Sequence, residues 1–206
     1  MRLAAILSAT LLLVFCSPTF AQVFYQYPDA PTVEAGRFDV GTYLSGGEDL
    51  FRWGGFGRLG IVHYWDVGFE VLVESFNGDW RGGAGGDLRY QLLPTTSKLP
   101  FDLSADVGFG FASGNDVTIY QAPVGAIISS PLKTDNGTLI TPFLGVYAVF
   151  TRTKATPSGL PEVSDNDVEA MLRGGVSVGL TENLKIYGTL QLGPQDLGSL
   201  GLSYRL

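Results

Sequence analysis

The sequence predicts an all-β fold, a closed antiparallel up-and-down transmembrane β-barrel of about ten strands, with eight as the alternative. Apolar and polar residues alternate along most of the chain, which is the pattern of a sheet with one apolar face. The alternating segments run for roughly ten or more residues, whereas about five or six is typical of soluble sheets. Glycine is abundant, with 28 residues, and charged residues make up only 16% of the chain.

An export signal at the N-terminus is the first predicted element. Arg2 is followed by an apolar run at 3–15, and the small residues Thr19 and Ala21 fit a cleavage site after Ala21. The apolar run is too short to span a bilayer. We therefore expect a signal peptide at 1–21, a short segment at 22–32 and the barrel at 33–206.

Strands follow in order, separated by turns or loops. Pro123 and Pro142 lie in the two segments that alternate least, which predicts a bulge or a weak segment there. If that pair is loop, the count falls to eight. Residues 151–169 form a long polar loop in this prediction. The expected strands are 33–44, 50–64, 66–77, 80–93, 101–112, 117–129, 138–151, 168–181, 183–193 and 197–206.

The polar faces of these strands carry positive and negative charges in equal number. An unpaired charge away from water is costly, and a barrel of eight to ten strands has a lumen that side chains fill. We therefore expect a salt-bridge network in the lumen and apolar side chains outside. The predicted lumen charges are Arg37, Asp39, Arg52, Arg58, Glu70, Glu74, Asp87, Arg89, Asp102, Asp106, Glu169, Arg173, Lys185 and Arg205.

Aromatic residues gather near the expected strand ends. Tryptophan and tyrosine at these levels form the interfacial girdles of membrane barrels. The predicted girdle consists of Tyr43, Trp53, Tyr64, Trp65, Trp80 and Tyr204.

The C-terminal residues Gly201-Leu202-Ser203-Tyr204-Arg205-Leu206 resemble the terminal strand signal of bacterial outer-membrane β-barrels, although that family usually ends in Phe or Trp. Residues 141–148 are also similar to strands of small barrels in this class. The resemblance implies a bacterial outer-membrane location, contact with outer-membrane lipid, and a periplasmic segment at 22–32. It also implies insertion by the barrel-assembly machinery, with Gly201, Tyr204 and Leu206 as the insertion signal, and no particular activity.

Catalytic motifs are weak in this sequence. Residues 175–179 match G-x-S-x-G, but they lie mid-strand with no histidine downstream. Residues 55–60 match G-x-G-x-x-G, but a strand follows where a dinucleotide site needs a helix. Acidic residues outnumber basic ones, 20 to 13, which argues against a nucleic-acid partner. We therefore expect no catalytic residue, no cofactor and no metal site.

Three function classes remain open. The first is a small outer-membrane barrel with a structural or surface-interaction role, a filled lumen and loop 151–169 as its contact segment. A narrow pore is a variant of it, although balanced lumen charges predict little conductance. The second is a barrel-embedded enzyme that modifies lipid or peptide, with His63 as general base. The third is a soluble exported barrel or sandwich whose apolar face points inward around a small apolar ligand.

Overall fold

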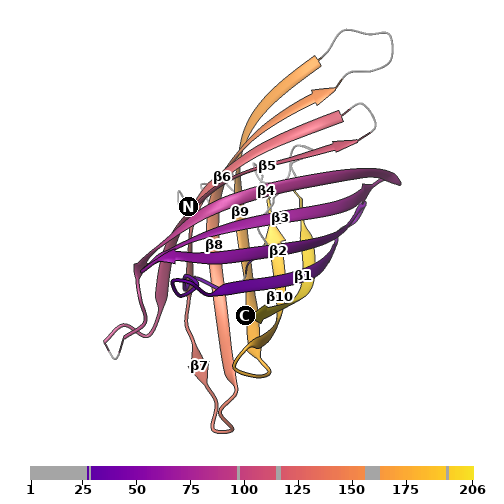
Figure 1. The fold of residues 1–206 in the computed structure, drawn as a ribbon. Coiled ribbons are helices and arrows are strands. Elements are labelled where there is room, and N and C mark those ends of the chain that lie inside the picture. The colour runs from indigo at the N-terminus through magenta and orange to yellow at the C-terminus, as the bar shows by residue number, and fades with distance from the viewer. Residues whose placement is uncertain (1–26, 28, 97, 115–116, 156–162, 194) are drawn as a thin grey trace, which may run out of the picture.

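The computed structural model describes residues 27, 29–96, 98–114, 117–155, 163–193 and 195–206, and the predicted signal peptide lies outside these residues. The described residues fold into strands joined by turns (Figure 1). The strands are β1 (Phe38–Gly46), β2 (Leu50–Val62), β3 (Trp65–Phe76), β4 (Asp79–Leu93), β5 (Asp102–Gly114), β6 (Val117–Ser129), β7 (Leu132–Lys133), β8 (Leu139–Ala155), β9 (Val163–Gly179), β10 (Leu184–Leu192) and β11 (Leu197–Arg205).

Every long strand pairs antiparallel with two neighbours, so the sheet closes on itself. The order runs β6-β5-β4-β3-β2-β1-β11-β10-β9-β8, and pairing of β6 with β8 completes the cylinder. The two-residue β7 only extends the turn before β8. Ten long strands are thus present among the described residues, as predicted. Closure removes the free edges that an open sheet would leave.

The described part of the chain contains no helix that is long and apolar enough to cross a membrane.

Side chains alternate between the two faces of the cylinder. On β3, Val71 points outward and is 58% exposed, whereas Asp66 and Glu74 point inward and are fully buried. Outward positions on the other long strands are also mainly Leu, Val, Ile and Phe. The arrangement is the inverse of a water-soluble barrel, which would place its apolar face inside.

The outward apolar surface has the height of a membrane core. On β8 the outward residues from Ile140 to Phe150 are apolar, and Arg152 is the first charged residue above them. Ten steps of about 3.3 Å cover about 33 Å along a strand, or about 25 Å along the axis at a tilt of about 40°. A transmembrane barrel has an apolar band about 25 Å tall.

Two expected boundaries were wrong. The first strand begins at Phe38 instead of residue 33, because the residues before it turn into the barrel. Much of the expected loop at 151–169 is strand, because β8 and β9 continue to Ala155 and from Val163 with unbroken pairing. In Figure 1 this hairpin, in orange, rises beyond the rest of the wall.

The two prolines lie within regular strands, and no register shift accompanies them. Of the two expected alternatives, the bulge was therefore wrong, whereas the β5–β6 ladder is weakened beside Pro123. Pro123 pairs with Val149 in the β6–β8 ladder. Toward β5 the ladder stops after Val107↔Val124 and resumes at Gly110↔Gln121 in the same register. The missing N–H of proline therefore interrupts one ladder locally without displacing the strand.

Candidate functional site

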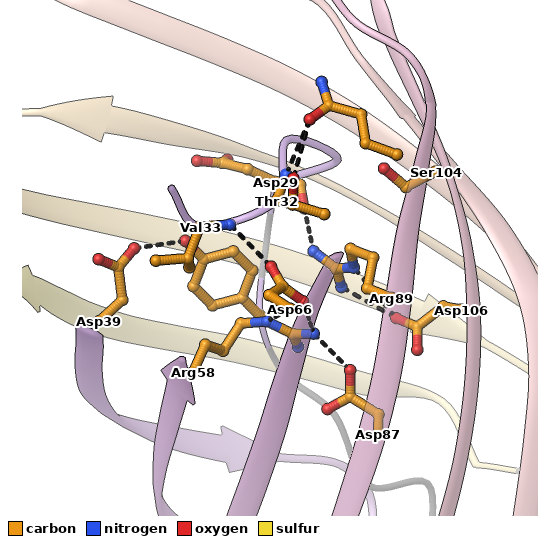
Figure 2. A network of polar contacts seen from close by, with 12 residues as sticks. Asp29, Thr32, Val33, Asp39, Arg58, Asp66, Asp87, Arg89, Ser104 and Asp106 are labelled. Carbon is orange, nitrogen blue, oxygen red and sulfur yellow. Dashed lines mark hydrogen bonds and ion pairs between the residues drawn. The ribbon is translucent and has the colours of Figure 1, made fainter. Parts of the chain in front are cut away.

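A short segment that precedes β1 lies inside the end of the barrel at which β1 begins and β11 ends. We call Tyr27 and residues 29–33 the plug. Within it, the side chains of Tyr27, Asp29, Ala30 and Val33 are buried. Figure 2 shows the segment surrounded by polar side chains from the wall.

Asp29 joins the plug to opposite sides of the wall. Its carboxylate accepts hydrogen bonds from Lys185 Nζ of β10 at 2.6 Å and from Ser177 Oγ of β9 at 2.7 Å. Its main-chain oxygen accepts from Arg89 Nη1 of β4 at 2.5 Å. The buried carboxylate is thus both charge-paired and hydrogen-bonded, as burial requires.

Main-chain groups of the plug also find partners on the wall. Ala30 donates its N–H to Ser129 Oγ at 3.2 Å, and its carbonyl accepts from the Ser104 hydroxyl. Val33 donates its N–H to Asp66 Oδ2 at 2.8 Å. Side chains from β3, β5 and β6 therefore replace the water that an irregular segment would otherwise need.

Tyr27 lies at the centre of the plug. Its ring lies 5.0 Å from the guanidinium carbon of Arg58 and 5.3 Å from that of Arg89, in cation–π range. Its hydroxyl donates to Asp39 Oδ2 at 2.6 Å, and its main-chain oxygen accepts from Arg173 Nη2 at 3.1 Å. The side chain and the main-chain carbonyl of Tyr27 thus contact β1, β2, β4 and β9.

The Tyr27 hydroxyl is held in its neutral form. Burial raises its pKa well above the ordinary value, and the negative charges of Asp39 and Asp29 act in the same direction. The hydroxyl therefore remains a donor to Asp39 at physiological pH.

Behind the plug, the wall carries a cluster of ion pairs across β2–β5. Arg58 Nη2 lies 2.5 Å from Asp66 Oδ1 and 2.6 Å from Asp87 Oδ2. Arg89 Nη2 lies 2.9 Å from Asp106 Oδ2. All five side chains are buried. Figure 2 shows that they form a continuous chain of contacts with the plug.

Further pairs lie at both ends of the lumen. Arg52 and Glu74 are fully buried, and Arg52 Nη2 lies 3.1 Å from Glu74 Oε2. At the end that holds the plug, Arg205 Nε lies 2.8 Å from Asp39 Oδ1, with Arg205 partly exposed. The predicted lumen residue Asp102 accepts from Gln91 Nε2 at 2.8 Å.

Tyr43 was wrongly placed in the aromatic girdle. It is 1% exposed, points into the lumen and donates its hydroxyl to Glu70. Its neighbours in register are Gly54 and Gly201, and a Cβ on Gly54 would collide with the Tyr43 ring. The ring therefore occupies space that Gly54 leaves open.

Of the other predicted lumen charges, one lies outside the lumen, and one has the inward parity of Arg173 but lies beyond β10. Arg37 precedes β1 and is exposed, so placing it in the lumen was wrong. Glu169 is half-buried on the part of β9 that extends beyond β10. Conversely, Asp29 and Asp66 belong to the cluster although neither was among the predicted lumen charges. The turn between β2 and β3 consists of residues 63 and 64, and Tyr64 has a φ of 68°.

The remaining girdle residues do not point into the lumen. Trp53 and Trp80 are exposed near the end opposite the plug, whereas Trp65 and Tyr204 are exposed near the end that holds the plug. Tyr64 is half-buried in the β2–β3 turn. Their placement fits two levels of aromatic side chains, and their role as a girdle stays a prediction.

The three residues of the expected insertion signal lie on or just after β11. Gly201 is half-buried, and a Cβ there would collide with the Tyr187 ring. Tyr204 and Leu206 are exposed, and the Leu206 N–H donates to Phe38 O at 2.8 Å. The last residue is thus tied to the start of the first strand, while use of these residues in insertion stays a prediction.

The sequence motifs for catalysis have structural explanations. Ser177 lies within β9 and donates to Asp29 rather than projecting from a strand–helix turn. The His63 ring packs on that of Tyr64 at 3.7 Å between centroids, and its side chain is exposed. Gly60 lies under the Glu34 carbonyl, where a Cβ would collide. Among the described residues, no group of three or more His, Cys, Asp or Glu side chains is placed to hold a metal ion.

Comparisons with known proteins give similarities of structure. No family model and no curated protein matches the chain. Solved structures that resemble it include β-barrels of bacterial outer-membrane proteins and designed transmembrane β-barrels. The β domain of the Bordetella autotransporter BrkA is 11% identical, with 82% of this chain and 98% of that chain covered and a TM-score of 0.47.

Two further structures extend the comparison. The N-terminal β-barrel domain of Pseudomonas aeruginosa OprF is 10% identical over 84% of this chain and 98% of that chain, with a TM-score of 0.39. The KdgM porin is 12% identical over 81% of this chain and 98% of that chain, with a TM-score of 0.41.

Proposed function

We propose that the chain is a bacterial outer-membrane barrel with a structural or surface-interaction role and a closed, non-conducting lumen. The outward apolar band, about 25 Å tall, supports the membrane location because exposing so large an apolar surface to water is energetically unfavourable. The plug carries the rest of the proposal. It fills one end of a lumen in which Arg52, Arg58, Arg89 and Arg205 are paired with carboxylates of the wall. This arrangement supports a lumen without a wide path for a solute.

Heat-modifiable gel mobility tests the membrane barrel. Closed membrane barrels resist SDS until heated, so the mature protein from membrane fractions should run at two positions, compact without boiling and slower after it. A band that boiling does not move, or recovery of the protein in a detergent-free soluble extract, would refute the proposal.

Planar-bilayer recording tests the closed lumen. We expect the intact mature chain to give no resolved channel openings, because the plug and the ion pairs fill the lumen. Reproducible unitary steps from protein that passes the mobility test would leave the barrel in place and replace the closed role with that of a narrow pore.

The β8–β9 hairpin is the proposed surface-contact segment, because it extends beyond the neighbouring β10. Cys16 is the only cysteine, so cleavage of the signal would leave a mature chain free of thiols for labelling. In intact cells, a membrane-impermeant maleimide should label Ser164→Cys but not Asp135→Cys, which lies at the opposite end. Labelling of Asp135→Cys alone would invert the proposed orientation.

A further inference from the structure

Arg81 is a buried cation whose guanidinium has donors without acceptors. It lies near the start of β4, at the end of the barrel opposite the plug, and its inward side chain is only 9% exposed. Its Nε and Nη1 atoms are buried and have no hydrogen-bond partner among the described residues. None of the ion pairs found there includes Arg81. Burying unpaired donors and an unpaired charge is unfavourable, so this side chain requires an explanation.

The carboxylate beside Arg81 in the sheet is bound to another arginine. Glu74 of β3 is in register with Arg81 on one side and with Arg52 of β2 on the other. Arg52 Nε and Nη2 donate to Glu74 Oε2 at 3.3 and 3.1 Å, and both side chains are fully buried. Asp79, the preceding residue of the same parity on β4, is exposed beside the turn. The row of Arg52, Glu74 and Arg81 therefore holds two positive charges and one negative charge.

The other close neighbours of Arg81 hold the guanidinium in place without using its N–H groups. On β5, a Cβ at Gly114 would lie 3.0 Å from both Cα and Cγ of Arg81, so this side has no room for a side chain. Ala112, the next inward residue of β5, offers only a methyl group. The guanidinium carbon of Arg81 lies 5.7 Å from the centre of the Phe76 ring, in cation–π range. A ring contacts the face of a guanidinium and leaves the donors at its edge available.

From this arrangement we infer that Arg81 is the recognition group of a site for a small carboxylate, which enters the lumen from the end opposite the plug. The N–H groups of Arg81 donate to the carboxylate of the ligand, as those of Arg52 donate to Glu74 in the same row. The planar guanidinium fits a carboxylate well, and charge-assisted hydrogen bonds of this kind are strong. A carboxylate also carries one negative charge, which is the amount that the row lacks.

The site is compatible with a closed lumen, because the plug fills the other end of the barrel. The inference rests on the proposed barrel and adds a ligand class to its surface-interaction role. It does not require a path through the protein, since Arg81 lies close to the β3–β4 turn at the mouth of the cylinder.

NMR of the arginine Nε–H signals tests the inference on the isotope-labelled mature barrel in detergent, with sodium acetate as the probe. We expect one signal, identified as Arg81 by its absence in Arg81→Gln, to shift saturably with a dissociation constant of about 10 mM or less. Sodium chloride should bind at least about ten-fold more weakly, because a spherical ion cannot use the two-oxygen geometry. Arg37→Gln removes an exposed cation outside the lumen and should leave the Arg81 response unchanged.

Thermal conversion of the compact gel band gives a second readout. A ligand that binds only the folded state stabilises it, so acetate should raise the transition temperature of the wild type and of Arg37→Gln above that in chloride of equal ionic strength. Arg81→Gln should show no such difference. If Arg81→Gln gives no compact band, Arg81→Lys, which keeps the charge, identifies the NMR signal instead.

Three results would overturn the site. They are the absence of a saturable shift in the wild type, equal affinity for chloride, and a saturable acetate response that survives in Arg81→Gln. Equal affinity for chloride would identify a site for any small anion. Heat-modifiable mobility reports on the barrel separately, so its loss in the wild type would be a failure of the proposed function instead.

Discussion

Gly68 lies inside β3 at a point where the lumen has no room for a side chain. A Cβ at this position would lie 2.9 Å from Arg58 Nη1 and 3.0 Å from Asp87 Cγ, and closer still to one carboxylate oxygen. Gly68→Ala should therefore force the Arg58–Asp87 pair apart. We expect a loss of about 1–3 kcal/mol in the free energy of unfolding, measured by denaturant unfolding in lipid vesicles.

Gly82 on β4 is the matched control for that substitution. A Cβ there would have no atom within 4 Å. Gly82→Ala should change the free energy of unfolding by less than about 0.5 kcal/mol. Equal effects of the two substitutions would show that the Arg58–Asp87 pair tolerates the added methyl group.

The neutral Tyr27 hydroxyl makes stability depend on pH in the alkaline range. Its folded pKa is raised, so the stabilisation from its bond to Asp39 is complete below the unfolded pKa of about 10 and is lost as pH rises. Tyr27→Phe should cost about 1.5–3 kcal/mol at pH 8. Above pH 10 the gap between the two proteins should narrow by about 1.4 kcal/mol per pH unit.

Denaturant unfolding of both proteins at pH 8 and pH 11 measures this gap. Comparing the two proteins at each pH cancels the titration of all other groups, which they share. A gap that stays constant between the two pH values would mean that the Tyr27 hydroxyl ionises equally in both states.

Whether a single side chain points into the lumen or outward was predictable from the sequence wherever strand parity was applied consistently. Tyr43 has the same parity as Asp39, which was placed inside, so the alternation itself would have put Tyr43 in the lumen. Asp66 was missed although it lies in the expected strand 66–77 with the parity of Glu70 and Glu74, which were placed inside. Asp29 could not be found by parity, since the plug is not a strand.

At the scale of elements, the first part of β9 has one open edge. The ladder to β10 ends at Leu172↔Leu192, so within the described residues Val163 and those that follow it pair with β8 alone. Open edges are templates for association with other strands. Here Asp165 and Asp167 accept from the backbone N–H of the residue that follows each of them. The two carboxylates thus occupy donors that an incoming strand would use.

Removing these acceptors should allow the open edge of β9 to pair with strands of other molecules. We expect Asp165→Ala with Asp167→Ala to form dimers or larger species in detergent, detected by light scattering behind size exclusion, whereas the wild type stays smaller. The doubly substituted Asn variant keeps the side-chain oxygens and should behave as the wild type does. Association of the Asn variant to the same extent would point to lost charge rather than to an uncapped edge.

Strand positions were predictable because period-two alternation is strong in long segments that face lipid on one side and a lumen on the other. The exception is the segment 151–169, where polar residues lie on both faces. Alternation vanishes there because the hairpin extends past the apolar band, although its pairing continues. Strand pairing through the backbone, without an apolar face, leaves no alternation of apolar and polar residues in the sequence.

At the scale of the whole molecule, the plug connects parts of the wall that are distant in sequence. Its contacts reach β1–β6 on one side and β9 and β10 on the other. Asp29→Ala should lower stability by about 3 kcal/mol, because it leaves the Lys185 ammonium without its carboxylate partner and removes the acceptor of Ser177.

The temperature at which half of the protein converts from the compact to the slow gel band measures this loss. Asp29→Asn retains an acceptor for Ser177 but not the charge, so its transition should fall between wild type and Asp29→Ala. Asp135→Ala, an exposed acidic residue, should leave the transition unchanged. A wild-type transition in Asp29→Ala would mean that the plug contributes nothing to the closed wall.

Alternation left one property of the whole molecule undecided, namely whether the apolar face of the sheet points outward or inward. A period of two is the same in both arrangements. Charge balance on the polar faces favoured the outward apolar arrangement, because a narrow interior requires paired ions. The plug, in contrast, has no period, and its partners lie far away in sequence. Only the closed cylinder brings Lys185 and Ser177 next to Asp29.

The plug and the wall it seals belong to one polypeptide, and only residues 34–37 separate them. A displaced plug would stay at an effective concentration in the millimolar range, so it would reseat within the same molecule regardless of dilution. A peptide of the same sequence added in trans would have to reach that concentration to compete. The seal is thus tethered in place, and opening it would take a change in the wall rather than the departure of a ligand.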